Sequence, residues 1–145
     1  MKRLTQKVFY LMGRHKNIET PEALKNFFLS YQKETKNNPF IVKDWVGKDA
    51  LEVYKEKERP LTIEGFECWL ADHDIIEDLG DYLRNKDNRY DDYATICSYI
   101  KKHTRKDQIE GGMAGVYNPS ITQRLNGLTE QIQNTVIAEQ PLFPD

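Results

Sequence analysis

The sequence predicts a mainly α-helical protein with one β-hairpin, and two features carry that prediction. Apolar residues recur at helical spacing in three stretches, near residues 21–36, 63–83 and 90–110. Residues 40–58 instead carry β-branched and aromatic side chains on both sides of Gly47-Lys48-Asp49, which is typical of two strands joined by a turn. The length of 145 residues suits one domain with short arms at its ends.

The first helix is expected to begin at Pro21. Thr20 can cap it, and proline is tolerated at the first helical position because its missing N–H would have no partner there. The helix should end near Asn37-Asn38-Pro39. Its predicted inward residues are Ala23, Leu24, Phe27, Phe28 and Tyr31.

The predicted hairpin is unusual in its second arm. That arm alternates Leu51, Val53 and Tyr54 with charged residues, so it is too polar to be buried on both faces. We expect the hairpin to project from the core or to pair with a neighbour.

Residues 59–86 predict two short helices joined by a tight turn at Asp72-His73-Asp74, a pattern that looks like a helix-turn-helix. Thr62 is the expected first cap. The inward residues would be Ile63, Phe66, Trp69 and Leu70, then Ile76, Leu79, Tyr82 and Leu83. Seven acidic residues and no lysine or arginine lie between Arg59 and Arg84, which disfavours reading of the DNA major groove by the second helix.

A longer helix is predicted from about Tyr90 to about Glu110, and its basic flank is the first candidate DNA contact. The apolar stripe comprises Tyr93, Ile96, Cys97, Ile100 and Thr104. Away from it lie Lys101, Lys102, Arg105 and Lys106, which could contact phosphates without reading sequence or could form an ordinary solvated flank.

Charge is also segregated toward the two ends of the chain. The net charge is only −2, so nucleic-acid binding would need local basic patches. Residues 129–145 carry Glu130, Glu139 and Asp145 with no basic residue. The first 16 residues contain no acidic residue, and their basic residues are the second candidate DNA contact: Lys2, Arg3, Lys7, Arg14 and Lys16.

The stretch "GGMAGVYNPSITQRLNGL" at residues 111–128 is rich enough in glycine to suggest a phosphate loop. A helix precedes it and no lysine follows it, so nucleotide binding is disfavoured. It is better interpreted as a join between helices. Gly111 or Gly112 would end the long helix in a left-handed cap, Gly115 would let the chain turn, and Asn118 would cap a last helix at Pro119.

No catalytic or metal-binding pattern is evident. The Asp72-His73-Asp74 triplet is expected to be a solvated turn with an N-cap aspartate, because no partner at ligand spacing completes a coordination shell. Cys68 and Cys97 occupy periodic apolar positions and are predicted to be buried and reduced. We therefore expect no enzyme activity, cofactor or metal. No apolar run is long enough to cross a membrane, so we expect a cytoplasmic protein with no membrane partner.

Several ordered segments resemble the DNA-packaging small terminase subunits of tailed double-stranded DNA bacteriophages. They are "ETPEALKNFFLSYQKETKNNP", the hairpin, "RPLTIEGFECWL", the helix pair and, most specifically, "YNPSITQRLNGLTE" after the glycines. The resemblance implies a non-enzymatic ring of identical subunits with a helical core and a crown-like hairpin. Such a ring recognises double-stranded viral DNA and regulates the large terminase subunit, which carries the ATPase and nuclease.

With this resemblance the chain divides into a basic arm (1–17), a helical core (18–130, hairpin at about 40–58) and a flexible acidic tail (131–145). Some family members end in a basic DNA-binding tail, whereas the tail of this chain is acidic and short. DNA contact is therefore expected at the amino-terminal arm or the Lys101 to Lys106 flank. Residues expected to pack in the oligomer or the core are Trp45, Val53, Tyr117, Ile121 and Leu125. A dimeric helix-turn-helix transcriptional regulator remains the alternative.

Overall fold

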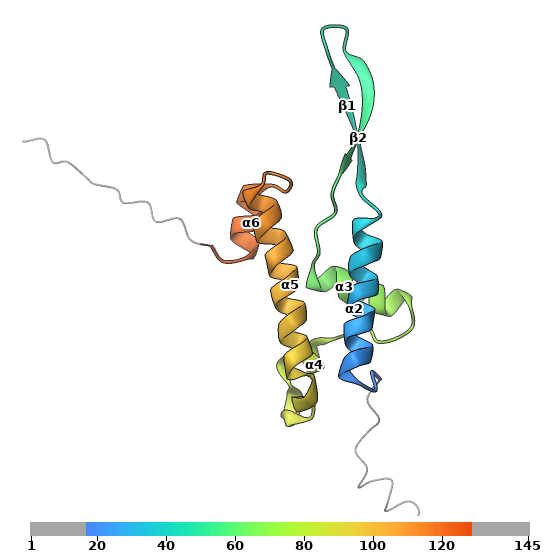
Figure 1. The fold of residues 1–145 in the computed structure, drawn as a ribbon, viewed down its shortest axis with the longest axis vertical. Helices are drawn as coiled ribbons and strands as arrows, with labels where there is room; N and C mark the ends of the chain where they lie inside the picture. Colours follow the sequence, from blue (N-terminus) through green and yellow to red (C-terminus); the bar gives the residue numbers. More distant parts are fainter. Residues whose placement is uncertain (1–16, 129–145) are drawn as a thin grey trace, which may run out of the picture.

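A β-hairpin projects from a bundle of helices in the computed structural model, which describes residues 17–128 (Figure 1). This confirms the predicted class of a mainly helical protein with one hairpin. The elements are α2 (Pro21–Lys36), β1 (Phe40–Val46), β2 (Leu51–Lys57), α3 (Ile63–Asp72), α4 (Gly80–Arg84), two single 3-10 turns (Lys86–Asn88 and Asp91–Tyr93), α5 (Ala94–Met113) and α6 (Pro119–Leu125).

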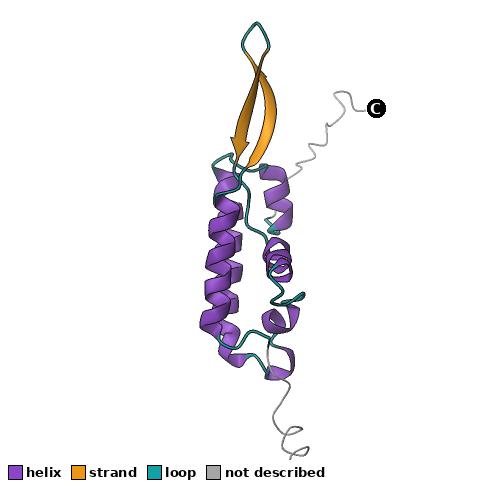
Figure 2. Cartoon of the chain, turned by 90° about the vertical axis from the view of Figure 1, so that its right-hand side faces the viewer, coloured by secondary structure: helices purple, strands orange, loops and turns teal. Residues whose placement is uncertain are grey.

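Helices α2 and α5 form the long axis of the molecule and run in the same direction (Figure 1). The hairpin continues from the carboxyl end of α2, well clear of the helices (Figure 2). Helix α6 packs against the carboxyl-terminal end of α5, near the base of the hairpin. Helix α4 packs at the opposite end of α5.

The core is built around Phe28 of α2, which is fully buried. Its ring makes edge-on contacts with Phe66 of α3 at 5.3 Å and with Tyr99 of α5 at 6.2 Å between centroids, a favoured geometry for aromatic pairs. The predicted stripe of the long helix is confirmed, since all five of its residues are buried: Tyr93, Ile96, Cys97, Ile100 and Thr104.

Ile18 fixes the start of the described chain to the α4 end of the bundle, opposite the hairpin. Its side chain is buried, its backbone N–H donates to the Tyr82 hydroxyl at 3.0 Å, and its carbonyl accepts from the Tyr93 hydroxyl. Burial raises the pKa of both tyrosines, which keeps them as neutral donors and acceptors. Both backbone groups of Ile18 therefore have partners inside the core.

The predicted N-caps Thr20, Thr62 and Asn118 are confirmed. The Thr20 side chain accepts from the Ala23 N–H, Thr62 from the Gly65 N–H and Asn118 from the Ile121 N–H. Each bond satisfies one of the N–H groups that a helix start leaves without a partner. These short-range signals set where α2, α3 and α6 begin.

The predicted second helix of the pair was too long. Helix α4 covers only Gly80–Arg84. Helix α3 stops at Asp72, and two residues later Asp74 has a left-handed backbone conformation (φ 55°). The Ile75 N–H then donates to the Leu70 carbonyl at 3.0 Å. Asp74 thus helps to end α3, as glycine or asparagine often does, and the prediction of an N-cap role in the turn was wrong. The long helix also begins later than predicted, at Ala94, after the two 3-10 turns.

The roles predicted for Gly111 and Gly112 were wrong, because α5 continues through both to Met113. The left-handed residue is Gly115 (φ 74°), with the Val116 N–H donating to the Gly111 carbonyl at 2.9 Å and the Gly115 N–H to the Gly112 carbonyl at 3.2 Å. A Cβ on Gly111 would overlap the Tyr117 ring, and one on Gly112 would lie 2.7 Å from the Thr122 methyl group. These two glycines let α6 and its preceding loop approach α5.

Replacing Gly111 with alanine should lower stability although alanine favours helix by about 1 kcal/mol. The new methyl group would push the Tyr117 ring away, and overpacking of this kind costs about 1–3 kcal/mol. Urea unfolding measures the difference. Ser98→Ala, at an exposed position of the same helix, is the control and should be neutral or slightly stabilising. A Gly111→Ala protein more stable than wild type would contradict the packing role.

Candidate functional site

The predicted basic flank of α5 divides into two rows, and one row has a structural role. The Lys101 ammonium donates to the Leu83 carbonyl at 3.2 Å, and the Arg105 guanidinium donates to the Asn126 carbonyl at 2.9 Å. These carbonyls lie at the carboxyl ends of α4 and α6, where cations are favourable. Lys101 and Arg105 therefore hold two short helices to α5.

The other row is better suited to phosphate contact. Lys102 is exposed and forms no ion pair with any residue of the described range 17–128. Among the residues that the structure describes, Lys106 pairs only with Glu110 on the same helix, at 3.4 Å, with both side chains about two-thirds exposed. Such an exposed pair contributes little and is easily exchanged for a phosphate.

Lys25 is a further cation beside this row, one that the sequence analysis did not single out. Its ammonium lies 5.3 Å from the centroid of the Tyr99 ring, and Tyr99 contacts the His103 ring at 4.0 Å. Lys25 comes from α2 and Tyr99 from α5, so the seam between the two long helices carries cations and aromatic rings. The amino-terminal candidates Lys2, Arg3, Lys7, Arg14 and Lys16 lie outside the described residues.

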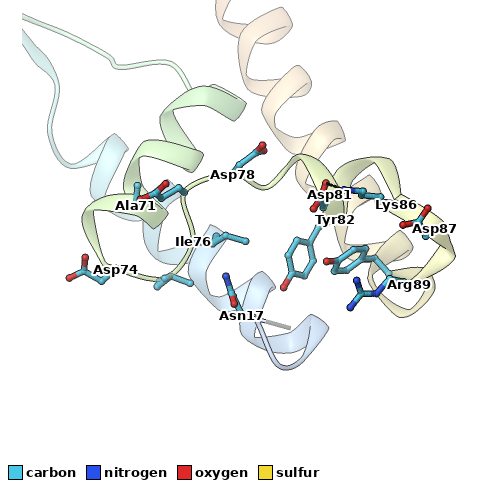
Figure 3. Close-up of a pocket in the computed structure, with 13 residues that line it drawn as sticks. Asn17, Ala71, Asp74, Ile76, Asp78, Asp81, Tyr82, Lys86, Asp87 and Arg89 are labelled. Atoms are coloured by element: carbon cyan, nitrogen blue, oxygen red, sulfur yellow. Dashed lines mark ion pairs between the residues drawn. The ribbon is translucent and has the colours of Figure 1, made fainter. Parts of the chain in front are cut away.

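The α4 end of the molecule holds a polar pocket with an acidic lining (Figure 3). Asn17, Ile76 and Tyr82 surround a space of about 620 Å³, with Asp74 and Asp87 on opposite sides. The complete set of charged lining residues is Asp74, Glu77, Asp78, Asp81, Asp87, Lys86 and Arg89. This excess of carboxylates repels phosphates, so DNA should not approach the α4 end.

The hairpin is regular and almost entirely exposed (Figure 2). Its register pairs Phe40 with Lys57 and Val46 with Leu51. Lys43 pairs with Glu52 at 2.8 Å on one face, and Lys55 with Asp44 at 2.6 Å on the other. Hydrogen bonds from these lysines lower the pKa of the two carboxyl groups. The charges of the strands are thus largely matched within the hairpin.

Large apolar side chains cover the rest of the hairpin. Trp45 is 57% exposed and Leu51 is 64% exposed, whereas Val53 is half-buried. We call the exposed apolar residues of the strands the hairpin surface; they are Phe40, Ile41, Val42, Trp45, Val46, Leu51 and Tyr54. Each strand has one edge that pairs with no other strand of the described residues. An isolated two-stranded sheet is marginally stable, so this surface is suited to contact with another chain.

Below the hairpin an apolar groove of about 270 Å³ runs between the hairpin base and α6. We call it the α6 groove; its main apolar lining residues are Phe40, Pro60, Val116, Ile121 and Leu125. Ile121 and Leu125 are each 63% exposed, so of the two places where they were expected to pack, the core or an oligomer, the core of their own chain does not hold them. Thr122 is instead the buried residue of α6, seated on Gly112.

Tyr117 connects this groove to a polar cluster around Lys36. The Lys36 ammonium pairs with Asp107 and, at 2.8 Å, with Glu58, and it donates to the Tyr117 hydroxyl at 2.7 Å and to the Arg59 carbonyl at 3.2 Å. The second oxygen of Asp107 accepts from the Leu61 N–H at 2.8 Å. The cluster therefore joins the end of α2, the chain leaving β2, the middle of α5 and the loop before α6.

Lys36 is held as a cation in this cluster. Partial burial disfavours its charge, but hydrogen bonds to Asp107, Glu58 and Tyr117 outweigh that effect and raise its pKa. A lysine with a raised pKa contributes its full stabilisation below its ordinary pKa of about 10.4, and the contribution falls only at higher pH. The orientation of the hairpin base is thus insensitive to pH near neutrality.

Within residues 17–128, no group of three or more His, Cys, Asp or Glu side chains is placed to hold a metal ion. His73 of the predicted turn stacks on Trp69 at 4.0 Å, and its Nδ1 lies 2.7 Å from the Trp69 carbonyl oxygen. Cys97 is buried, but Cys68 is exposed, which corrects the prediction that both are buried. Among the described helices, none combines the length and the apolar character that crossing a bilayer requires.

Replacing Lys36 with methionine should destabilise the protein by about 1–3 kcal/mol, because it leaves the poorly exposed Asp107 carboxylate without its cation. Thermal or urea unfolding gives the magnitude. Lys33→Met, an exposed lysine one turn earlier on α2, is the matched control and should change stability little. Equal losses of stability in the two variants would show that the cluster around Lys36 does not stabilise the protein more than an exposed lysine does.

Comparison with known proteins does not identify a family for this chain. No protein-family model matches the sequence, and a search of curated proteins finds no match.

Proposed function

We propose that this protein is a non-catalytic small terminase subunit, which assembles as a ring and binds double-stranded viral DNA during genome packaging. In this role it delivers DNA to the large terminase subunit and regulates the ATPase and nuclease of that partner in the host-cell cytoplasm. The resemblance of residues 18–130 to small terminase subunits suggests the role. The observation that supports it most is the exposed hairpin surface.

The hairpin surface favours self-assembly for a physical reason. A monomer would leave Trp45, Leu51 and Ile41 more than half exposed on a ribbon that contacts little of its own helical core. Contiguous exposed apolar residues of this kind mark protein interaction sites. Contacts between different surfaces of identical subunits close into a ring when the rotation between neighbours permits it.

A ring would also make weak DNA contacts effective. Lys102 and Lys106, with Lys25 nearby, offer each subunit only a few phosphate contacts. Repetition around a ring converts these into a multivalent surface whose overall affinity exceeds that of one copy. The acidic pocket near α4 would keep the DNA away from the opposite end of each subunit.

The role of the hairpin surface in self-assembly can be tested by measuring the molecular mass with light scattering. The full-length protein should have the mass of an oligomer at micromolar concentration, whereas the double variant Trp45→Glu and Leu51→Glu should be largely monomeric. Both positions are exposed, so the substitutions should leave the fold intact, as circular dichroism would verify. Leu29→Glu, an exposed leucine on α2, is the control. Monomeric wild-type protein would refute the ring.

DNA contact can be tested separately by the salt dependence of binding. Lys102→Glu with Lys106→Glu should weaken binding to duplex DNA and reduce the slope of log affinity against log salt by about one for each phosphate that the protein no longer neutralises. The ring mass should not change. Lys86→Glu, beside the acidic pocket, is the control and should leave affinity unaltered. Loss of binding with Lys86→Glu alone would instead favour a helix-turn-helix regulator.

A further inference from the structure

The α6 groove is the apolar feature of the described chain that a ring of hairpins does not by itself explain. It has a mainly apolar lining, open to solvent, with Ile121 and Leu125 on one side and Phe40 on the other. Its volume of about 270 Å³ is below the range of about 300–1,000 Å³ usual for small-molecule sites. It offers room for a few apolar side chains of a polypeptide.

We propose that the α6 groove is occupied by the chain's own carboxyl-terminal segment, residues 129–145, which inserts Leu142 and Phe143 between α6 and the base of the hairpin. This contact lies within one subunit and does not depend on assembly or DNA binding. It replaces the flexible tail expected from the sequence with a docked segment.

Proximity is the first argument for this occupant. The described chain stops at Leu128, three residues after groove residue Leu125. The 13 residues between Leu128 and Leu142 span about 20 Å on average as a flexible linker. A tether of that length gives an effective concentration in the millimolar range, which a separate partner would have to exceed.

The sequence of the segment is the second argument. Leu142 and Phe143 are adjacent and flanked by Pro141 and Pro144, and prolines in these positions disfavour helix and favour an extended backbone. An extended chain directs consecutive side chains to opposite sides, so Leu142 could face α6 while Phe143 faces the hairpin base.

Charge complementarity is the third argument. Glu139 and Asp145 flank the apolar pair, and residues 129–145 contain no basic residue. The groove offers cations to match. Lys57 lines it, and the Arg59 guanidinium lies 3.8 Å from the centroid of the groove residue Phe40. Glu58 also lines the groove, but its carboxylate is paired with Lys36 at 2.8 Å.

Disulfide trapping in the full-length chain tests the contact. In a Cys68→Ser background, the pair Ile121→Cys and Leu142→Cys should form an intrachain disulfide under mild oxidation, at least tenfold faster than the pair Ser120→Cys and Leu142→Cys. Ser120 is exposed on the same helix but does not line the groove, so the two pairs close loops of almost equal length. Cys97 is buried, which raises its thiol pKa and keeps it unreactive.

The products distinguish the possible occupants. Peptide mass mapping that shows the intrachain link supports the proposal. A link formed only between chains would mean that the segment fills a neighbour's groove, and equal rates for the two pairs would mean that it does not dock. Either result overturns the proposal, and the ring is tested separately by the mass of the unmodified protein.

Hydrogen exchange provides a second readout without engineered cysteines. Leu142→Asp with Phe143→Asp should speed exchange of the amides in residues 116–128 by at least threefold. Gln133→Asp with Asn134→Asp adds the same two charges to the segment without removing an apolar side chain, and should leave that exchange unchanged. Identical exchange in both variants would contradict docking through Leu142 and Phe143.

Discussion

Lys36 and Asp107 are 71 residues apart in sequence, and their contact fixes how the base of the hairpin is arranged against α5. Lys36 is the last residue of α2 before the hairpin, while Asp107 lies in α5 and also binds the backbone of the chain that returns from the hairpin. Tyr117 adds the loop before α6 to the same cluster. A projecting two-stranded ribbon has little core of its own, so its direction is set by this polar contact at its base.

The two ends of the bundle consequently have different surface chemistry. The end near α4 anchors Ile18 through two tyrosine hydroxyls and surrounds a pocket with carboxylates. The other end presents the hairpin surface and the α6 groove, both apolar. Between them, Lys25 lies where α2 meets α5, and Lys102 and Lys106 are exposed on α5. This polarity suits a subunit that contacts its copies at one end and DNA along the helices.

Local signals made much of the fold predictable. Thr20, Thr62 and Asn118 cap their helices as expected, because a cap depends on residues only three positions apart. Features that depend on distant residues were not predictable in the same way. In the sequence, Gly111 and Gly112 have the pattern of helix terminators. Their actual role is to make room for Tyr117 and Thr122, and that contact is visible only in the packed structure. Likewise, the structural use of Lys101 and Arg105 depends on where α4 and α6 end, which the charge pattern alone cannot reveal.

Electron microscopy of the assembled full-length protein tests the central claim most directly, because it shows both the symmetry of the particle and the location of each hairpin. The account predicts closed rings with cyclic symmetry, in which the hairpin surface of every subunit is covered by a neighbour. Particles that are monomers, or two-fold dimers whose hairpins remain exposed to solvent, would contradict it.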